Sequence, residues 1–518
     1  MYSMHMNKKP FYLTTTLPYV NAPLHMGHAL EFVRADILAR YKKLTGHEVF
    51  FNTGTDEHGV KIYNKAVENG KTAQEFVDAG FATFQEQLAQ FGISDDIHFI
   101  RTTDENHIAF AQAFWNKVNE NGYIYKKNYQ AKYCIGCESE KTDSDLVNGE
   151  CPNHPGIPLE LIDEENYFFK YSAFTEKLLA LYESRPDFVV PDFRLNEVKE
   201  FVKNGLQDFS ISRKVEKMPW GIPVPHDDGQ VMYVWFDALT NYISTLISPS
   251  EFETVFSSSI IPSQDSASPA FSGSISSSKT VSNLQEGLFE KFWVNGTPTQ
   301  YCGKDNNRFQ SAMWQAMLMA AGLPNSHQII INGFITGDGG VRMSKTLGNV
   351  IDPKQVADEY GTDALRMFLA KEISPWEDSP FTMERFAAAY NANLVNGLGN
   401  LVSRTLTMAE SYGVDVSDII FPDFIDIAHP AYERFDYAEV TTDIWREITD
   451  LDKYITETEP FKKFKVDPDQ ARSDVHHVII GLARIAVLLQ PIMPTTAEKM
   501  TELIKDGKKP SEPLFGRK

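Results

Sequence analysis

Residues 11–28 read FYLTTTLPYVNAPLHMGH, and the way the chain continues from this stretch decides the fold. Residues 11–17 form an apolar and β-branched run, which predicts a strand that ends at Pro18. A helical pattern then opens near His28 and continues toward Gly46. A second strand is expected over residues 48–53, next to the sequence GTDEHG. Strand, loop, helix and strand make the opening βαβ unit of a parallel sheet.

The rest of the chain changes pattern twice. From about Trp115 to Gln230, a segment with three cysteines and the sequence PWGIPVP looks like an insertion between two halves of the sheet. The α/β pattern resumes over residues 231–239 and again over 327–335. From about Phe386 onward, apolar residues recur at helical spacing, which predicts an all-α C-terminal domain.

Length and composition limit the classes of protein. A chain of 518 residues is too long for one hydrophobic core, and 42% hydrophobic with 23% charged residues is typical of a soluble protein. A net charge of −21 argues against coating nucleic acid through a general basic surface, although a local basic patch is still compatible with it. No apolar run is long enough for a bilayer and the N-terminus lacks a signal sequence, so we expect a cytoplasmic protein with no membrane partner. The serine-rich stretch 247–283 has the composition of a surface loop.

Four residues have the spacing of a metal knuckle. Cys134-x2-Cys137 is followed by thirteen residues and then by Cys151-x2-His154. Thiolates and an imidazole at this spacing suit tetrahedral zinc, whereas four cysteines in so long a chain do not suggest a disulfide scaffold. All four ligand positions are filled, so one structural zinc ion is expected and not a catalytic one.

His25-Met26-Gly27-His28 lies where the first strand passes into its helix. A helix N-terminus presents free N–H groups and a positive dipole end, both of which favour phosphate. Gly27 lets a nucleotide approach the backbone, and the two histidines can donate hydrogen bonds to phosphate oxygens. Two ordinary histidines at a helix start would look the same.

A second motif, Arg342-Met343-Ser344-Lys345-Thr346, follows the glycine-rich turn at residues 337–340. Two cations and two hydroxyls on such a loop can close over a triphosphate and offset the charge of a leaving pyrophosphate. By itself, a basic loop is more often only a solvated loop.

Together and in this order, the two motifs resemble the signature sequences of class I aminoacyl-tRNA synthetases. The resemblance covers nearly the whole chain and is closest to the methionyl-tRNA synthetase family. The stretches that look like their counterparts in that family are TLPYVNAPLHMGH, FFNTGTDEHG, YVWFDALTNYI, GKDNNRFQSAMW, RMSKTLGNVIDP and NLVSR.

The resemblance implies an α/β fold: a Rossmann-like parallel-sheet catalytic domain, split by a zinc-knuckle connective insertion and followed by an all-α anticodon-binding helical bundle. The implied domains are 1–115, the first half of the catalytic domain; 116–230, the connective insertion with the knuckle at 134–154; 231–345, the second catalytic half; 346–385, a linking region that contacts the tRNA stem; and 386–518, the anticodon-binding domain.

The implied activity is a ligase reaction in two steps. ATP activates L-methionine to methionyl-adenylate, and the methionyl group is then transferred to the 3′ end of tRNA(Met). Positioning and charge stabilisation would do most of the work, with Mg²⁺ on the phosphates. The resemblance assigns catalysis to His25, His28, Arg342 and Lys345, and contacts with ATP to these four together with Gly27 and Ser344.

The methionine pocket must hold an ammonium group and an uncharged thioether, for which aromatic walls are suitable partners. The resemblance places around it Leu17, Tyr19, Asp56, Trp235, Ala238, Tyr242, Asp305, Gln310 and Trp314. Asp56 would pair with the ammonium group, and Asp305 would lie near the ribose or the amino acid. Plain core packing is the alternative for Trp235 and Trp314.

The resemblance also assigns three anticodon-binding residues in the helical domain. Asn400 and Arg404 are four residues apart and therefore share one helix face. Phe461 stands where the family usually has a tryptophan that stacks on a base.

Two positions depart from the family pattern. Arg342 replaces the usual lysine and presents a planar fork in place of a point charge. Gln310 stands where the family usually has a histidine, at a position that should face the substrate.

Other readings of the chain explain less. Synthetases for leucine, isoleucine or valine normally need a large editing insertion, and one for cysteine needs zinc with an open position. A nucleotidylyltransferase would leave the knuckle and the helical domain unexplained. A tRNA-binding relative without activity is supported only by Arg342 and Gln310. We expect a monomer, since the chain ends soon after its last predicted helix, at EPLFGRK. No DNA partner is expected.

Overall fold

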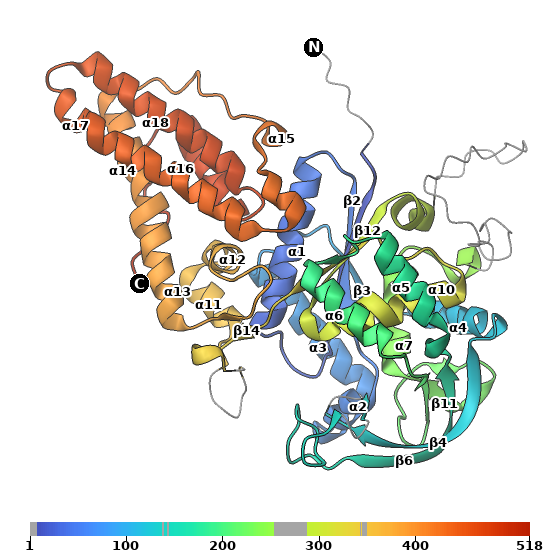
Figure 1. Ribbon diagram of the computed structural model, residues 1–518. Helices are drawn as coiled ribbons and strands as arrows, with labels where there is room; N and C mark the ends of the chain where they lie inside the picture. Colours follow the sequence, from blue (N-terminus) through green and yellow to red (C-terminus); the bar gives the residue numbers. More distant parts are fainter. Residues whose placement is uncertain (1–7, 137–138, 142–144, 253–286, 342, 344–349) are drawn as a thin grey trace, which may run out of the picture.

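A six-stranded parallel sheet forms the centre of the computed structural model (Figure 1), which describes residues 8–136, 139–141, 145–252, 287–341, 343 and 350–518. The strand order is β3-β2-β1-β12-β13-β7, and every neighbouring pair is parallel. The strands are β1 (Phe11–Thr15), β2 (Val49–Thr55), β3 (His98–Arg101), β7 (Val189–Val190), β12 (Thr297–Gly303) and β13 (Gln328–Asn332).

The order of the strands reverses beside β1. β2 and β3 continue to one side of it, whereas β12 lies on the other side, in register with Thr15 opposite Tyr301. In open parallel sheets, ligands bind at the carboxyl ends of the strands next to such a reversal. The loops after β1 and β12 therefore mark the position of the site.

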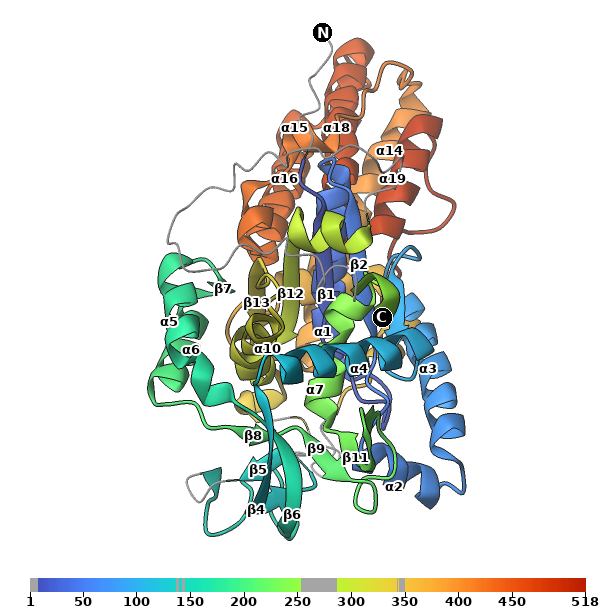
Figure 2. The same cartoon turned by 90° about the vertical axis from the view of Figure 1, so that its right-hand side faces the viewer.

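Two hydrophobic cores cover the two faces of the sheet. Alternate side chains of β1 enter different cores, Phe11 and Leu13 on one face and Tyr12 on the other, as the two-residue period of a strand requires. The first core is closed by α1 (Met26–Leu44) and α12 (Thr362–Lys371), and the second by α4 (Glu105–Glu120) and α10 (Trp314–Ala321). Figure 2 shows α4 and α10 beside the strands.

The connecting region contains a long antiparallel ribbon that projects from the body of the molecule (Figure 2). Its strands β4 (Ile124–Cys134) and β6 (Glu160–Phe169) pair from Ile124 opposite Phe169 to Tyr133 opposite Glu160. The insertion does not stay outside the main sheet, since β7 pairs with β13. The smaller strands are β5 (Ser139–Lys141), β8 (Phe209–Ser210), β9 (Ser212–Lys214), β10 (Pro223–Val224), β11 (Asp227–Met232), β14 (Ile335–Thr336) and β15 (Ser379–Pro380).

The C-terminal part is helical, as predicted, and packs on the α1 side of the sheet (Figure 1). Its helices are α13 (Met383–Ala389), a π-helical turn at Tyr390–Gly399, α14 (Asn400–Tyr412), α15 (Phe424–Ile427), a 3₁₀ turn at Pro430–Arg434, α16 (Tyr437–Thr458), α17 (Pro460–Lys463), α18 (Pro468–Leu489) and α19 (Pro494–Asp506). The C-terminal segment returns to the start of this domain, where the Tyr390 hydroxyl donates to the carbonyl of Gly516 at 2.8 Å.

The remaining helices connect these parts. They are α2 (Val60–Glu68), α3 (Ala73–Gln90), α5 (Thr175–Ser184), α6 (Asp192–Lys203), α7 (Val234–Leu239), α8 (Asn241–Ser244), α11 (Pro353–Tyr360), 3₁₀ turns at Tyr171–Phe174, Lys304–Asn306 and Asp338–Gly340, and π-helical turns at Phe289–Val294 and Phe309–Met313. Within the described ranges, no helix is long and apolar enough to cross a membrane.

The predicted fold class is confirmed, with small shifts at the element ends. The first strand ends at Thr15 instead of residue 17, and the second continues to Thr55. Several predicted features lie outside the described residues: Cys137, Arg342, Ser344, Lys345 and residues 253–283 of the serine-rich stretch. The domain boundaries remain predictions.

Candidate active site

His25 and His28 cap the helix that starts beside the reversal of the sheet. His25 Nδ1 accepts from the backbone N–H of Gly27 at 3.1 Å and of His28 at 3.4 Å, while His28 Nδ1 accepts from the N–H of His25 at 3.2 Å. The two rings stack with centroids 3.7 Å apart. Two imidazole nitrogens therefore take up N–H groups that a helix start otherwise offers to an anion.

Gly27 makes this arrangement possible. A Cβ atom there would lie 3.0 Å from Cε1 and 3.2 Å from Nδ1 of the His25 ring, tighter than ordinary contact. Gly27 is predicted to let a nucleotide approach the backbone; in the structure it also leaves room for His25 to fold over the helix start.

A cavity of about 480 Å³ opens onto this helix start. Its lining includes His25, Gly27 and His28, and, from other elements, Gly303, Asp305, Phe334 and Met343. Burial lowers the pKa of His28 well below its usual value, and the neighbouring His25 adds to the effect. The His28 ring is therefore neutral at neutral pH until an anion approaches it.

A second cavity, of about 240 Å³, adjoins the first. Thr16, His28, Asp305 and Asn306 line both. Eight of the nine residues predicted for methionine line the smaller cavity: Leu17, Tyr19, Asp56, Trp235, Ala238, Tyr242, Asp305 and Gln310. They come from segments spread over nearly 300 residues of the chain, which the sheet brings to one edge.

Trp235 and Trp314 differ in their positions. Trp235 lines the smaller cavity and stacks on Phe309, with centroids 3.8 Å apart and planes 4° apart. Trp314 is fully buried and does not line it; it lies edge-on to the Tyr242 ring, at 5.7 Å between centroids. Trp314 therefore packs against Tyr242 from the core and does not contact the cavity. This position corresponds to the core-packing alternative.

Asp56 lies at the end of β2 and forms a bridge with Tyr19, in which the Val20 N–H donates to the Asp56 carbonyl at 3.2 Å. Asp56 is one of the residues that line the smaller cavity. The helix that follows is capped by Gly59, so Asp56 does not act as a helix cap.

Glu31 is a site residue that was not predicted from the sequence. It lines the larger cavity one helical turn after His28, and one carboxyl oxygen accepts from the backbone N–H of Thr16 at 2.8 Å and from its hydroxyl at 2.5 Å. Burial raises the pKa of Glu31 to about 8, against the opposing effect of the Thr16 hydrogen bonds. Glu31 could have been predicted from its position three residues after His28, which places both residues on the same face of the helix.

A buried cluster next to the smaller cavity was also not predicted, although two of its residues, His58 and Asp237, lie in motifs quoted from the sequence. Asp237 accepts from His58 at 2.7 Å and from His107 at 2.8 Å, and all three side chains are buried. The pKa of Asp237 is lowered because two imidazoles offset its burial. This cluster ties α7, which carries Trp235 and Ala238, to the loop that follows Asp56.

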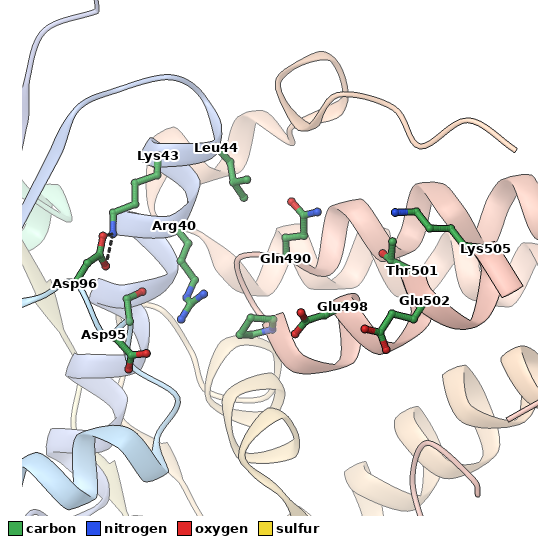
Figure 3. Close-up of a pocket in the computed structure, with 12 residues that line it drawn as sticks. Arg40, Lys43, Leu44, Asp95, Asp96, Gln490, Glu498, Thr501, Glu502 and Lys505 are labelled. Carbon is green, nitrogen blue, oxygen red and sulfur yellow. Dashed lines mark hydrogen bonds and ion pairs between the residues drawn. The ribbon is translucent and has the colours of Figure 1, made fainter. Parts of the chain in front are cut away.

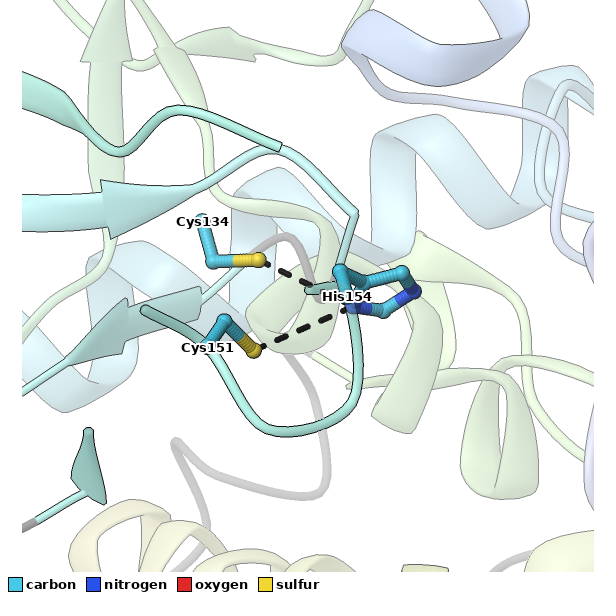
Figure 4. A group of neighbouring side chains, drawn as sticks. All are labelled: Cys134, Cys151 and His154. Atoms are coloured by element: carbon cyan, nitrogen blue, oxygen red, sulfur yellow. Dashed lines mark hydrogen bonds between the residues drawn. The ribbon is translucent and has the colours of Figure 1, made fainter. Parts of the chain in front are cut away.

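The described part of the knuckle fits zinc (Figure 4). The ligand atoms of Cys134, Cys151 and His154 lie within 4.8 Å of one another, and His154 Nδ1 is 3.8 Å and 3.9 Å from the two sulfurs. Neighbouring ligands around tetrahedral zinc are about 3.6–3.8 Å apart, given Zn–S of about 2.3 Å and Zn–N of about 2.1 Å. A Cβ at Gly136 would lie 2.4 Å from the His154 ring, so glycine is needed there.

The three predicted anticodon residues lie on two helices of the C-terminal domain. Asn400 begins α14 and is exposed, and Arg404 donates to Asp452 of α16 at 2.9 Å. Phe461 lies on the short α17 that follows α16, with 44% of its surface exposed. An exposed ring of this size is suited to stacking on an unpaired base.

A larger cavity of about 770 Å³ lies between α1 and α19 (Figure 3). Arg40, Lys43 and Asp96 face Glu498 and Lys505 across it, and Lys43 is paired with Asp96 at 2.6 Å. It contains none of the predicted site residues. Size is therefore a poor guide to the active site in this molecule.

The fold and the site together define a class I aminoacyl-tRNA synthetase: a parallel sheet whose first helix begins with paired histidines at the strand reversal, followed by a helical domain. The family description "tRNA synthetases class I (M)" matches residues 11–157, 156–265 and 268–406, and "Anticodon binding domain of methionyl tRNA ligase" matches residues 437–512. The chain belongs to the methionyl-tRNA synthetase family.

Individual relatives agree with this assignment. A methionine–tRNA ligase of Caldanaerobacter subterraneus is 38% identical over 96% of this chain and 74% of its own length, and one of Rhizobium meliloti is 34% identical over 96% and 92%. The structure of Mycobacterium tuberculosis methionyl-tRNA synthetase with methionyl-adenylate has a TM-score of 0.81 at 32% identity and covers 95% of this chain and 93% of its own.

Proposed function

We propose that the protein activates L-methionine with ATP to methionyl-adenylate and transfers the methionyl group to the 3′ end of tRNA(Met), for initiation and elongation of translation. The observation that carries this is the pair of adjoining cavities, which share His28 and Asp305. One opens on a helix start suited to phosphates, and the other has aromatic walls and a carboxylate. Two substrates that must react with each other are held side by side in this way.

The smaller cavity suits methionine in its polarity as well as its size. Asp56 is proposed to pair with the ammonium group, and Trp235 and Tyr242 to contact the thioether side chain. The methionine carboxylate then faces the larger cavity, from which it attacks the α-phosphorus of ATP in line and expels pyrophosphate.

Charge on the phosphates is proposed to be stabilised by groups from two loops. His25 and His28 donate hydrogen bonds once protonated or turned toward the anion, at the start of α1. Arg342, Ser344 and Lys345 are proposed to contribute from the second motif, with Mg²⁺ arriving on the nucleotide. The neutral state of Glu31 at pH 7 keeps a negative charge away from this site.

The other parts of the chain are proposed to serve the tRNA. Asn400, Arg404 and Phe461 would bind the anticodon, and residues 346–385 would contact the stem. Zinc held by Cys134, Cys137, Cys151 and His154 would stabilise the end of the β4–β6 ribbon without taking part in the reaction. A cytoplasmic location and a monomeric state are part of the proposal.

Amino-acid-dependent ATP–pyrophosphate exchange, with each of the twenty amino acids in turn, tests the proposal. Exchange with methionine, followed by charging of tRNA(Met), is expected. Exchange with another amino acid would contradict the pocket assignment and leave the class I assignment intact. No exchange from folded, zinc-loaded protein would favour a tRNA-binding relative without activity.

A further inference from the structure

Glu57 is a charged residue that directly follows Asp56 in the chain and lines neither cavity of the candidate site. Its side chain is completely buried. The proposed reaction does not use it. The question is why a carboxylate lies inside the protein beside the residue proposed to bind the ammonium group, since a buried charge is costly unless it is paired.

Four hydrogen bonds hold the Glu57 carboxylate. Arg101 Nε donates to Oε1 at 2.8 Å and Arg101 Nη2 donates to Oε2 at 2.9 Å, in the planar two-pronged geometry of a guanidinium on a carboxylate. The Thr55 hydroxyl donates to Oε1 at 2.6 Å, and the Thr103 hydroxyl donates to Oε2 at 2.5 Å. Each carboxylate oxygen therefore has two partners, and the orientation of the Glu57 side chain is fixed.

The peptide group between Asp56 and Glu57 is held as well. Its carbonyl, from Asp56, accepts from the N–H of Val20 at 3.2 Å, and its N–H, from Glu57, donates to the Thr102 hydroxyl at 2.9 Å. The next carbonyl, of Glu57, accepts from Trp220 Nε1 at 2.6 Å. The direction in which the Asp56 side chain leaves the backbone depends on this segment.

Arg101 belongs to the neighbouring strand of the sheet. It is the last residue of β3 and lies opposite Thr55 in the parallel pair with β2. Its guanidinium also donates to Asp78 of α3 at 2.6 Å and stands over the Phe81 ring, 4.7 Å from the centroid. Arg101 is therefore anchored by its own strand and by α3, and through Glu57 it holds the end of β2.

Stability alone does not explain this ion pair. Replacement of a buried ion pair by apolar residues of similar volume is often neutral or stabilising, because the charges no longer have to lose their hydration. An apolar pair lacks direction, however. A guanidinium and a carboxylate joined by two parallel hydrogen bonds have one relative orientation, whereas apolar side chains have several. The ion pair therefore serves the geometry of the chain next to it, which is that of Asp56.

We propose that Arg101 is a positioning residue which, through Glu57, directs the Asp56 carboxylate toward the ammonium group of the amino acid. The inference rests on the proposed function, because it concerns the ammonium group of that substrate. Arg101 and Glu57 line neither cavity, so both act through Asp56. The direction of Asp56 matters because a hydrogen bond weakens steeply as its angle departs from linear.

Two analogues without a carboxylate isolate the contribution of the ammonium group. Methioninol keeps the amino group of methionine, and 4-methylthiobutanol has the same chain without it. Neither can be activated, so each is used as a competitive inhibitor of methionine-dependent ATP–pyrophosphate exchange. The ammonium ratio is the inhibition constant of 4-methylthiobutanol divided by that of methioninol. It measures how strongly the site binds the amino group.

In Arg101→Met, the ammonium ratio is expected to fall about tenfold, as for loss of one charge-assisted hydrogen bond, while the inhibition constant of 4-methylthiobutanol does not change. The sign separates two causes. Loss of a positive charge by itself would strengthen the binding of an ammonium group and raise the ratio. A misdirected Asp56 lowers it. In an Asp56→Asn background, Arg101→Met should change the ratio no further.

A double variant keeps the test open if Arg101→Met does not fold, since that substitution leaves Glu57 buried without its counter-ion. Glu57→Met combined with Arg101→Met removes both charges, and an apolar pair of similar volume is expected to fold. Its ammonium ratio should fall by a similar factor. Because this variant has the net charge of the wild type, the fall cannot come from a change in total charge.

Arg40→Met is the matched control. Arg40 is 24% exposed and pairs at 2.7 Å with Asp36, which is completely buried, much as Arg101 is 18% exposed and pairs with the completely buried Glu57. Arg40 lines neither cavity of the candidate site. Its ammonium ratio should equal that of the wild type, whatever loss of stability thermal unfolding shows.

An unchanged or raised ammonium ratio in the double variant, with a lowered ratio in Asp56→Asn, would overturn the role of Arg101 and leave the proposed function intact. An Arg101→Met effect that persists in the Asp56→Asn background would also overturn it. Where the single and double variants disagree, the double variant decides, because it leaves no unpaired buried charge. Absence of methionine-dependent exchange in the wild type would overturn the proposed function itself, and with it the substrate named here.

Discussion

Arg366 Nη2 lies 2.7 Å from Asp36 Oδ2, and both side chains are completely buried. Asp36 belongs to α1, which begins at the paired histidines, and Arg366 belongs to α12. The same guanidinium donates to the carbonyls of Pro491 and Ile492, where α18 passes into α19. One arginine thus connects the active-site helix to the helical domain.

Breaking this pair by Asp36→Asn is expected to destabilise the protein by about 3–5 kcal/mol, since it leaves a buried guanidinium without its counter-ion. Arg366, Arg40 and Ser94 lower the pKa of Asp36 in spite of its burial. Because this pKa is lower in the folded state than in the unfolded state, the ionised Asp36 carboxylate stabilises the folded protein at pH values above 3.8. This stabilisation is lost as the pH falls through the folded-state pKa. Urea unfolding from pH 7 to pH 3 should show the difference in stability between wild type and variant start to narrow once the pH falls below 3.8.

The control for this pair is Arg446→Met, which removes an ion pair with Asp443 in which the arginine is 65% exposed. Such a pair contributes only about 0–1 kcal/mol. If the two variants lost equal free energies of unfolding, the buried pair would stabilise the protein no more than the exposed pair does.

Glu31→Gln is expected to flatten the pH dependence of stability. Burial raises the pKa of Glu31 from 4.5 to about 8, so between these values the folded state holds a proton that the unfolded state has lost. Stability should therefore fall with rising pH across this window, by up to about 1.4 kcal/mol per pH unit for one proton. The variant lacks this slope, as denaturant midpoints at pH 5, 6, 7 and 8 would show.

Glu502→Gln, an exposed position on α19, is the comparison for Glu31→Gln. It should retain the wild-type slope. If Glu31→Gln also retained it, Glu31 would be ionised in the folded protein at neutral pH.

The knuckle is expected to hold one zinc ion per chain. Cys151→Ser and His154→Ala should each lower the zinc content measured by metal analysis after dialysis, since each removes one of four ligands. Cys302→Ser is the control, because Cys302 is buried in β12, away from the cluster. Full zinc content in all three variants would show that the metal is bound elsewhere.

Arg404→Ala and Phe461→Ala are expected to lower kcat/KM for tRNA by about tenfold or more, since a base contact contributes about 1–3 kcal/mol. ATP–pyrophosphate exchange should not change, because both residues lie in the helical domain. Arg446→Ala, on an exposed face of α16, is the matched control for charge. A parallel loss of exchange activity would indicate unfolding or an effect on the catalytic domain.

The sequence by itself determined the class of fold, because hydrophobic periodicity, prolines and glycines act locally. The structure contains the strand predicted from residues 11–17, its end before Pro18 and the helices predicted after Phe386, with ends shifted by a few residues. It also predicted which residues of the knuckle lie together, since cysteines and histidines that could hold a metal are recognised by type and spacing, and Cys134, Cys151 and His154 are neighbours in the structure. For the predicted methionine pocket, resemblance to a family indicated nine residues, and eight of them line one cavity.

The tertiary structure decided what depends on residues far apart in the chain. It moved Trp314 behind Tyr242, revealed the buried Glu31, and joined Asp237 to His58 and His107. Local patterns carry no information on such features, because burial and hydrogen-bond direction depend on which distant side chains the fold brings together.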